Sequence, residues 1–119
     1  MSASLTKLEI IKKQPDIDRV FRTGRAVSRR GIKMVYSPND LGFSRIIVIP
    51  IKHYGNAVQR NKIRRRIKEI WRCNKDHLVS GYDFVFLVYP GKVYDHDKQV
   101  KKLIDLCVEA GVYHTPTDN

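Results

Sequence analysis

The side chains with the clearest chemical potential are the basic ones between Gly55 and Lys75. On a helix of about 100° per residue, one face of this segment gathers an amide and four cations: Asn61, Arg64, Arg65, Lys68 and Arg72. Cations one turn apart repel each other, and the segment holds a single acid, Glu69, to relieve them. A helix that merely faces solvent usually interleaves acids with bases. The pattern therefore predicts an anionic partner for this face.

Phosphate is the anion that these residue types fit. The planar guanidinium of arginine binds two phosphate oxygens at once. The amide of Asn61 can both donate and accept, so it can bind a backbone oxygen, a 2′-hydroxyl or a hydrated metal. The pattern therefore predicts a phosphate-binding surface, and for a nucleic-acid partner the affinity should fall steeply with salt.

A second stripe of the same segment predicts how the basic face is positioned. Its apolar residues fall together on a helix and pack against the rest of the protein: Ile63, Ile67, Ile70 and Trp71. Asn56 is a good N-cap after Gly55, so we expect a helix from there to about Asn74. By its helical phase, Trp71 is an anchor of this helix and not a base-stacking residue.

The charge of the whole chain agrees with a polyanionic partner. There are 23 Lys+Arg residues against 12 Asp+Glu residues, which gives a formal charge of +11 and a pI of about 9.9. Such an excess costs self-repulsion in the folded state and favours binding to nucleic acid or to an anionic membrane surface. Charge alone leaves both partners open.

Length and cysteine usage bound the class of protein. A chain of 119 residues with 42% hydrophobic composition fits a single domain, 1–119, with loose ends at 1–8 and 115–119. Cys73 and Cys107 stand alone, as in a reducing cytosol. No apolar run suits a signal peptide or approaches the roughly 20 residues of a membrane span. We expect a cytoplasmic protein with no membrane association.

The remaining periodicity predicts the other elements. A short helix from Asp16 to Gly24 should precede a strand segment, 26–36, that can divide in two. A turn at 37–40, a strand over 43–51 and the basic helix follow. A strand over 83–89 and a helix opened by Asp95 or Asp97 complete the order. This order predicts an α+β fold, a single-domain α/β sandwich with a small, mostly antiparallel sheet packed on helices.

Other kinds of site find little support in the sequence. The four histidines lack metal-ligand spacing, and we expect no metal site. No Gly-rich phosphate loop, nucleophile elbow or spaced carboxylate pair is present, so we expect no catalytic residue. Phe21 and Tyr36 could stack on bases of a single strand, whereas Phe84 and Phe86 belong to a core strand.

At this point the residues match a known family. The run Gly55-Asn56-Ala57-Val58, followed by Arg60-Asn61-Lys62-Ile63-Arg64-Arg65, closely resembles the signature of the protein component of bacterial ribonuclease P. That family carries an Arg-Asn-Arg/Lys-x-Lys/Arg-Arg helix after Gly-Asn/Lys-Ala-Val. Val20-Phe21 before a glycine, and Gly81-Tyr82-Asp83 before an apolar strand, are similar to the family as well. The resemblance spans nearly the whole chain.

The resemblance implies a function and a fold. The chain would be the protein subunit of a ribonucleoprotein endonuclease that removes the 5′ leader from precursor tRNA, with a ribosomal protein S5 domain 2-like fold. The RNA subunit would hold the catalytic site and, with the substrate, the Mg²⁺ ions. The polypeptide alone would not be catalytic and would need no cofactor of its own. The implied partners are the catalytic RNA and precursor tRNA, with no obligate protein partner.

The resemblance also assigns two binding surfaces. The residues implied to bind the RNA subunit are Arg60, Asn61, Lys62, Arg64, Arg65, Lys68 and Arg72. The residues implied to line a leader-binding cleft between the first helix and the sheet are Ile17, Phe21, Ile32, Met34, Tyr36 and Lys52. Two positions depart from the family. Ile17 stands where an aromatic is usual, and Ile49-Pro50-Ile51-Lys52-His53 stands where Val-Ser-Lys-Lys precedes the glycine.

Two alternatives come from other classes. A ribosomal or other structural RNA-binding protein would suit the basic helix equally, but it would not distinguish precursor from mature tRNA. A DNA-binding regulator fits less well, because no short helix and tight turn precede the basic helix as a helix-turn-helix requires.

Overall fold

The structure is a computed structural model that describes residues 7–90 and 96–113. Its elements are η1 (Lys7–Glu9), α1 (Gln14–Thr23), β1 (Arg25–Arg29), β2 (Ile32–Pro38), β3 (Arg45–Pro50), α2 (Ala57–Asn74), η2 (Lys75–His77), β4 (Tyr82–Val88) and α3 (His96–Ala110). The predicted order of elements is confirmed. Of the predicted loose ends, residues 7 and 8 begin η1, and 1–6 and 115–119 lie outside the described residues.

The predicted strand segment 26–36 divides in two. A two-residue loop, Arg30 and Gly31, joins β1 to β2, which pair with Arg29 opposite Ile32. Gly31 has a φ of +86°, a left-handed conformation that glycine adopts without strain. β2 also runs two residues beyond the predicted end, because Ser37 and Pro38 continue the ladder with β4.

The four strands form one mixed sheet in the order β1-β2-β4-β3. β1 with β2 and β2 with β4 are antiparallel, whereas β3 and β4 are parallel. The predicted mostly antiparallel sheet and α+β fold are therefore confirmed. A parallel pair needs a long crossover, and α2 supplies it between β3 and β4.

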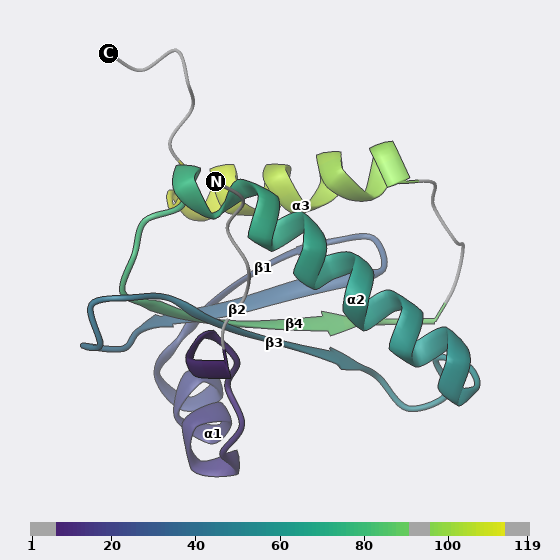
Figure 1. Cartoon of the computed structure of the whole chain (residues 1–119), viewed down its shortest axis with the longest axis horizontal. Helices are drawn as coiled ribbons and strands as arrows, with labels where there is room; N and C mark the ends of the chain where they lie inside the picture. Colours follow the sequence, from purple (N-terminus) through teal and green to yellow (C-terminus); the bar gives the residue numbers. More distant parts are fainter. Residues whose placement is uncertain (1–6, 91–95, 114–119) are drawn as a thin grey trace.

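The helices lie on both faces of the sheet. α2 and α3 cover one face and α1 crosses the other, as Figure 1 shows. The larger core lies under α2 and α3, where Ile46, Phe84 and Phe86 of the sheet are fully buried. A smaller core lies under α1 and joins Ile11, Ile17 and Val20 to Val35 and Val85. A sheet covered on both faces explains why β4 is apolar almost throughout.

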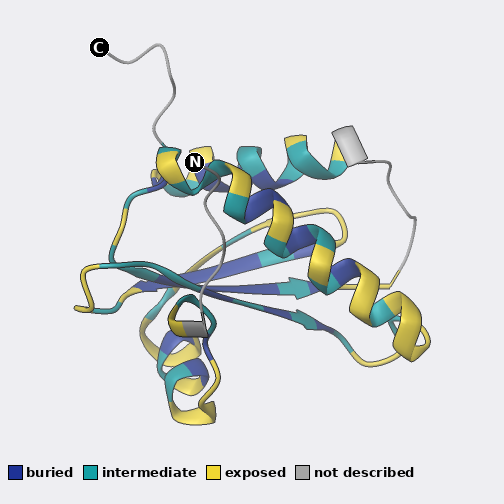
Figure 2. Ribbon diagram, viewed as in Figure 1, coloured by how far each residue is buried: buried dark blue, intermediate teal, exposed yellow. Residues whose placement is uncertain are grey.

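α2 has the bounds and the anchor that the sequence predicts. Asn56 accepts a hydrogen bond from the Gln59 backbone N–H (2.9 Å), and the Gln59 side chain accepts one from the Asn56 N–H (2.9 Å). This reciprocal cap fixes the start of the helix. The predicted apolar stripe is confirmed as its buried residues: Ile63, Ile67, Ile70 and Trp71. Figure 2 shows the buried stripe alternating with exposed turns.

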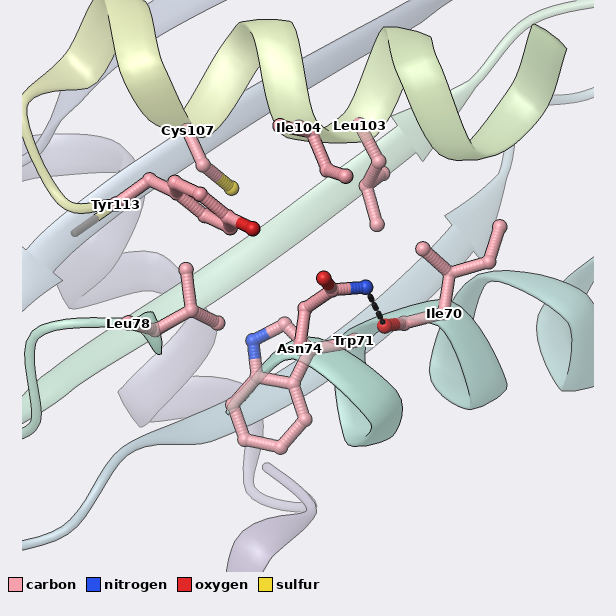
Figure 3. A pocket seen from close by; sticks show the side chains of 8 residues that line it. All are labelled: Ile70, Trp71, Asn74, Leu78, Leu103, Ile104, Cys107 and Tyr113. Atoms are coloured by element: carbon pink, nitrogen blue, oxygen red, sulfur yellow. Dashed lines mark hydrogen bonds between the residues drawn. The ribbon is translucent and has the colours of Figure 1, made fainter. Parts of the chain in front are cut away.

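The C-terminal half of α2 packs against α3. Figure 3 shows Trp71 below a small cavity that Leu103 and Cys107 of α3 close from above. The indole contacts Phe84 edge-on, with 6.3 Å between the ring centroids. Trp71 is 2% exposed, so its prediction as an anchor is confirmed. Both cysteines are free, as predicted; Cys107 is buried and Cys73 is exposed.

The two other helices begin close to their predicted starts. α1 begins at Gln14, two residues before the predicted start at Asp16, with Pro15 in its first turn. α1 stops where predicted: Gly24 donates to the Val20 carbonyl (2.8 Å) as the chain turns into β1. α3 begins at His96, between the two predicted caps, of which Asp95 lies outside the described residues.

Candidate nucleic-acid interface

The side of α2 that faces away from the sheet carries the basic side chains. Asn61, Lys62 and Arg65 are exposed, and Arg64 and Lys68 are partly exposed. Within residues 7–90 and 96–113, none of the four cations among them forms an ion pair with an acid. Of the four cations predicted for the uncompensated face, Arg64, Arg65 and Lys68 are therefore uncompensated within these ranges, whereas Arg72 pairs with Glu69. The buried stripe behind the face holds it in place.

Asn61 has a role that its exposure alone does not show. Its side-chain oxygen accepts a hydrogen bond from Arg64 Nη1 at 2.9 Å, one turn further along the helix. This contact restricts the guanidinium of Arg64 and uses one of its two Nη groups. An arginine fork that is already oriented loses less side-chain entropy when it binds phosphate.

Two predicted contact residues of α2 are engaged inside the protein. The guanidinium of Arg72 forms a bidentate contact with the carboxylate of Glu69, and this hydrogen bond raises the pKa of Arg72 and lowers the pKa of Glu69. Arg60 points back toward the end of β3, where its Nη2 lies 3.4 Å from the Pro50 carbonyl oxygen. Both side chains are less available for phosphate than Arg64 or Arg65.

The opposite face of the sheet holds the second predicted surface, and here the structure corrects three assignments. Ile32, Met34 and Tyr36 do not face α1. All three belong to the core under α2 and α3, where their exposed fractions are 4%, 0% and 8%. Since side chains alternate along a strand, the residues of β2 that face α1 are Lys33, Val35 and Ser37.

Strand register arranges the α1 face in three parallel rows, about 7 Å apart. The clamp row is Ser37, Asp83 and Arg45. The covered row is Ala26, Val35, Val85 and Ile47. The open row is Ser28, Lys33, Leu87 and Ile49. α1 lies over the middle of the covered row, where Ile17 and Val20 meet Val35 and Val85, whereas Ala26 at the β1 end of the row is exposed. Ser28 is exposed and the other three members of the open row are partly exposed.

The clamp row fixes one flank of α1. The carboxylate of Asp83 is fully buried and accepts from Arg45 Nε (2.9 Å) and Nη2 (2.7 Å), from Asn39 Nδ2 (2.8 Å) and from Arg19 Nη2 (2.5 Å). Arg19 belongs to α1 and also donates to the Pro38 carbonyl (3.1 Å). A buried carboxylate with four donor contacts is well compensated. The cluster therefore ties α1 to β3, β4 and the loop after β2.

The environment of Asp83 favours its charged form. Burial alone would raise the pKa of Asp83. The hydrogen bonds from Arg45 and Asn39, together with the positive charges of Arg45 and Arg19, outweigh this, so the pKa lies below the ordinary value. The hydrogen bonding between Arg45 and Asp83 also raises the pKa of Arg45.

The other flank of α1 carries Phe21. On the helix Phe21 falls about 160° from Arg19, so it lies away from the clamp and toward the open row. Its side chain is 45% exposed. Ile17 is instead buried against the sheet (7% exposed). Lys52 is exposed in the loop between β3 and α2. Of the six residues predicted for the leader, Phe21 and Lys52 remain accessible.

The sequence analysis missed the Asp83 cluster and the position of Lys33 on the α1 face, although the sequence contains a signal for each. Asp83 precedes five apolar residues of a strand, and a carboxylate at the start of a buried strand needs cations nearby. Lys33 alternates with the apolar residues of β2, which places it on the other face. What the sequence lacked was the identity of the helix that covers each face.

Other kinds of site are not apparent in the part of the chain that the structure describes. Across 7–90 and 96–113, no three His, Cys, Asp or Glu side chains gather as metal ligands would. No helix in these ranges combines the length and apolar character needed to cross a bilayer.

These observations define a small α+β protein whose main helix presents an uncompensated basic face. Comparison with known proteins identifies the family within this class. A family model described as Ribonuclease P matches residues 5–110. The chain is 40% identical over 81 residues to the ribonuclease P protein component of Petrotoga mobilis, covering 68% of this chain and 69% of that protein. It is 33% identical over 112 residues to that of Syntrophus aciditrophicus, covering 94% and 89%.

Solved structures agree with the sequence relatives. The Staphylococcus aureus RNase P protein matches with a TM-score of 0.81 at 28% identity, over 89% of this chain and 98% of that one. The Thermotoga maritima protein matches with a TM-score of 0.76 at 25% identity, over 85% and 96%. The chain belongs to the ribonuclease P protein family.

Proposed function

We propose that this chain is the protein subunit of a cytoplasmic ribonuclease P and binds the catalytic RNA through α2. The observation that carries the proposal is the α2 helix itself, which is capped at Asn56 and anchored by Trp71. It leaves Lys62, Arg64, Arg65 and Lys68 without acidic partners in the described structure. A rigid row of cations meets the regular phosphate spacing of an RNA backbone with little loss of entropy.

The open row is the surface that we propose for the 5′ leader of precursor tRNA. Leu87 and Ile49 offer a partly exposed apolar floor, and Phe21 stands at its border with 45% of its side chain exposed. Lys33 supplies a cation within the row. Aromatic and apolar groups beside a cation suit single-stranded RNA, whose bases stack while its phosphates are neutralised. Lys52 extends the same surface toward the start of α2.

The chain would assist the reaction without performing it. In this proposal the RNA subunit and the substrate hold the Mg²⁺ ions that activate water and stabilise the leaving oxygen. The protein contributes binding energy and position: α2 fixes it to the RNA subunit, and the open row holds the leader in line with the cleavage site.

Reconstitution with a bacterial ribonuclease P RNA tests the proposal. The chain alone should cleave nothing. Added to the RNA, it should lower the Mg²⁺ concentration needed for cleavage and raise the affinity for precursor tRNA above that for mature tRNA. If Mg²⁺ requirement and leader affinity both stay unchanged, the proposal is wrong.

Variants separate this function from that of a structural RNA-binding protein. Arg64→Gln with Arg65→Gln should weaken binding to the RNA subunit. Lys101→Gln, a matched loss of charge at an exposed position of α3, should not. A ribosomal-type protein would show the same α2 dependence but no preference for precursor over mature tRNA.

A further inference from the structure

The positive charge of the chain is concentrated in two segments. α2 holds seven basic residues and one acid. The segment 19–39, bounded by Asp18 and Asp40, holds six basic residues and no acid. The other 80 residues hold ten basic and eleven acidic residues and are close to neutral. The second segment therefore matches α2 in net charge, although the function proposed above uses only one of its basic residues, Lys33.

The two basic segments lie at opposite edges of the sheet. α2 packs over β3, which forms one edge, whereas β1 forms the other and contacts α3 on one of its faces. Strands are spaced by about 4.8 Å, so β1 and β3 lie roughly 14 Å apart. Figure 2 shows β1 exposed along most of its length. One RNA strand on the basic face of α2 would leave β1 uncovered.

Three arginines on and beside β1 have no acidic partner among the residues the structure describes. Arg22 lies at the end of α1, Arg25 opens β1 and Arg30 lies in the hairpin loop, and all three are exposed. We name them the edge surface. The two other arginines of the segment are compensated: Arg19 by Asp83, and Arg29 by Glu109 of α3.

Protection of a free sheet edge is the simplest alternative explanation. Charged side chains on an edge strand discourage pairing with other chains. Charges of either sign serve that purpose, however, and a mixture avoids self-repulsion. A run of one sign, without an acid over 21 residues, is costly unless an anion compensates it. The use of arginine in particular favours phosphate, which its planar fork binds bidentately.

We infer that the edge surface is a second RNA-binding site, which holds phosphates of an RNA segment other than the one on α2. The chain then bridges two RNA segments across the width of its sheet. The edge surface consists of guanidinium groups, which bind phosphate, so it binds the RNA backbone and does not read bases.

The number of RNA molecules bound per chain tests this inference. A short oligouridylate is titrated at low salt into the full chain, and the stoichiometry is measured by native mass spectrometry. The variant Arg25→Gln/Arg30→Gln should bind one oligonucleotide fewer than wild type. The salt dependence of total binding should also fall, by about 0.7 in the log–log slope for each lost phosphate contact. Arg64→Gln/Arg65→Gln, on α2, should keep the edge site.

Lys12→Gln/Lys13→Gln is the matched control, because both lysines are exposed and follow Ile11, whose N–H bonds to Ile46 of β3 at the opposite edge of the sheet. Circular dichroism checks that all variants are folded. If the Arg25→Gln/Arg30→Gln variant keeps the stoichiometry and slope of the control, the edge surface binds no RNA. An oligoglutamate that displaces the edge-bound RNA at equal charge concentration would also overturn the inference, since the site would then be a general anion site. Neither outcome depends on ribonuclease P activity.

Discussion

The helices on the two faces of the sheet are held by different forces. α2 is anchored by an apolar stripe, Ile63 to Trp71, and its charged residues lie on a separate side. α1 has only Ile17 and Val20 buried, and its position depends on the Asp83 cluster along one flank. The comparison teaches that an apolar anchor needs none of the charges of its helix, whereas a polar anchor commits charges to the fold. α1 therefore offers a binding surface on one flank only.

The largest effect is expected when the Asp83 carboxylate, which anchors α1, is removed. Asp83→Ala leaves Arg19 and Arg45 without their shared partner, and removing one partner of a buried ion pair costs about 3–5 kcal/mol. The two arginine side chains keep 30% and 16% of their exposure, so we expect the lower end of this range. Urea unfolding measures the loss. Asp105→Ala, in the exposed pair with Lys101, is the control and should cost less than about 1 kcal/mol.

Two neighbouring residues of β2 test which face of the sheet binds the leader. Met34 is fully buried under α2 and α3, so Met34→Ala should lower the free energy of unfolding by about 2–5 kcal/mol. It should leave the leader affinity of the folded protein unchanged. Lys33→Ala, one residue earlier, should do the reverse: little change in stability and a loss of affinity for precursor tRNA. A leader defect in folded Met34→Ala protein would restore the original assignment.

The contrast between Met34 and Lys33 shows which features of the fold could be predicted from the sequence and which could not. The phase of α2 was predictable because four apolar residues recur among cations, and only one helical face accommodates them. On β2 the alternation was equally visible, but both faces of a sheet between helices carry apolar residues. Which set faces α1 depends on the face of the sheet to which the β3–α2–β4 crossover carries α2 (Figure 1), and on register, neither of which local periodicity contains. The Asp83 cluster likewise joins residues from four separate segments.

Acid should loosen the α1 side before it affects the α2 side. The pKa of Asp83 is lower in the folded protein than in the unfolded chain, so the unfolded chain takes up the proton first as pH falls. The stabilisation is complete above the ordinary aspartate pKa of about 3.9 and is lost as pH falls through the folded value. The stability difference between wild type and Asp83→Asn should therefore shrink at acid pH. A difference that stays constant from neutral pH to pH values below that range would contradict this account.

Two arginines on α2 should differ in their contribution to RNA binding. Arg65 is exposed, so Arg65→Gln should reduce the log–log salt slope for the RNA subunit by about one unit. The guanidinium of Arg72 is already paired with the Glu69 carboxylate, so Arg72→Gln should change the salt slope by clearly less than Arg65→Gln does. Each slope comes from affinities measured over a series of salt concentrations. Equal changes would mean that RNA breaks the Arg72–Glu69 pair and uses both arginines.

The smallest effect is expected behind the basic face, at Trp71. Its indole Nε1 is buried and has no hydrogen-bond partner among the described residues. Trp71→Phe removes that N–H, whose burial costs about 1–3 kcal/mol when unsatisfied. It also shortens a ring that packs against Phe84, which costs a similar amount. The two terms oppose each other, so urea unfolding should show a change within about 1 kcal/mol. A loss well above that would mean that Nε1 gains a partner in solution, and that the anchor of α2, like that of α1, includes a polar contact.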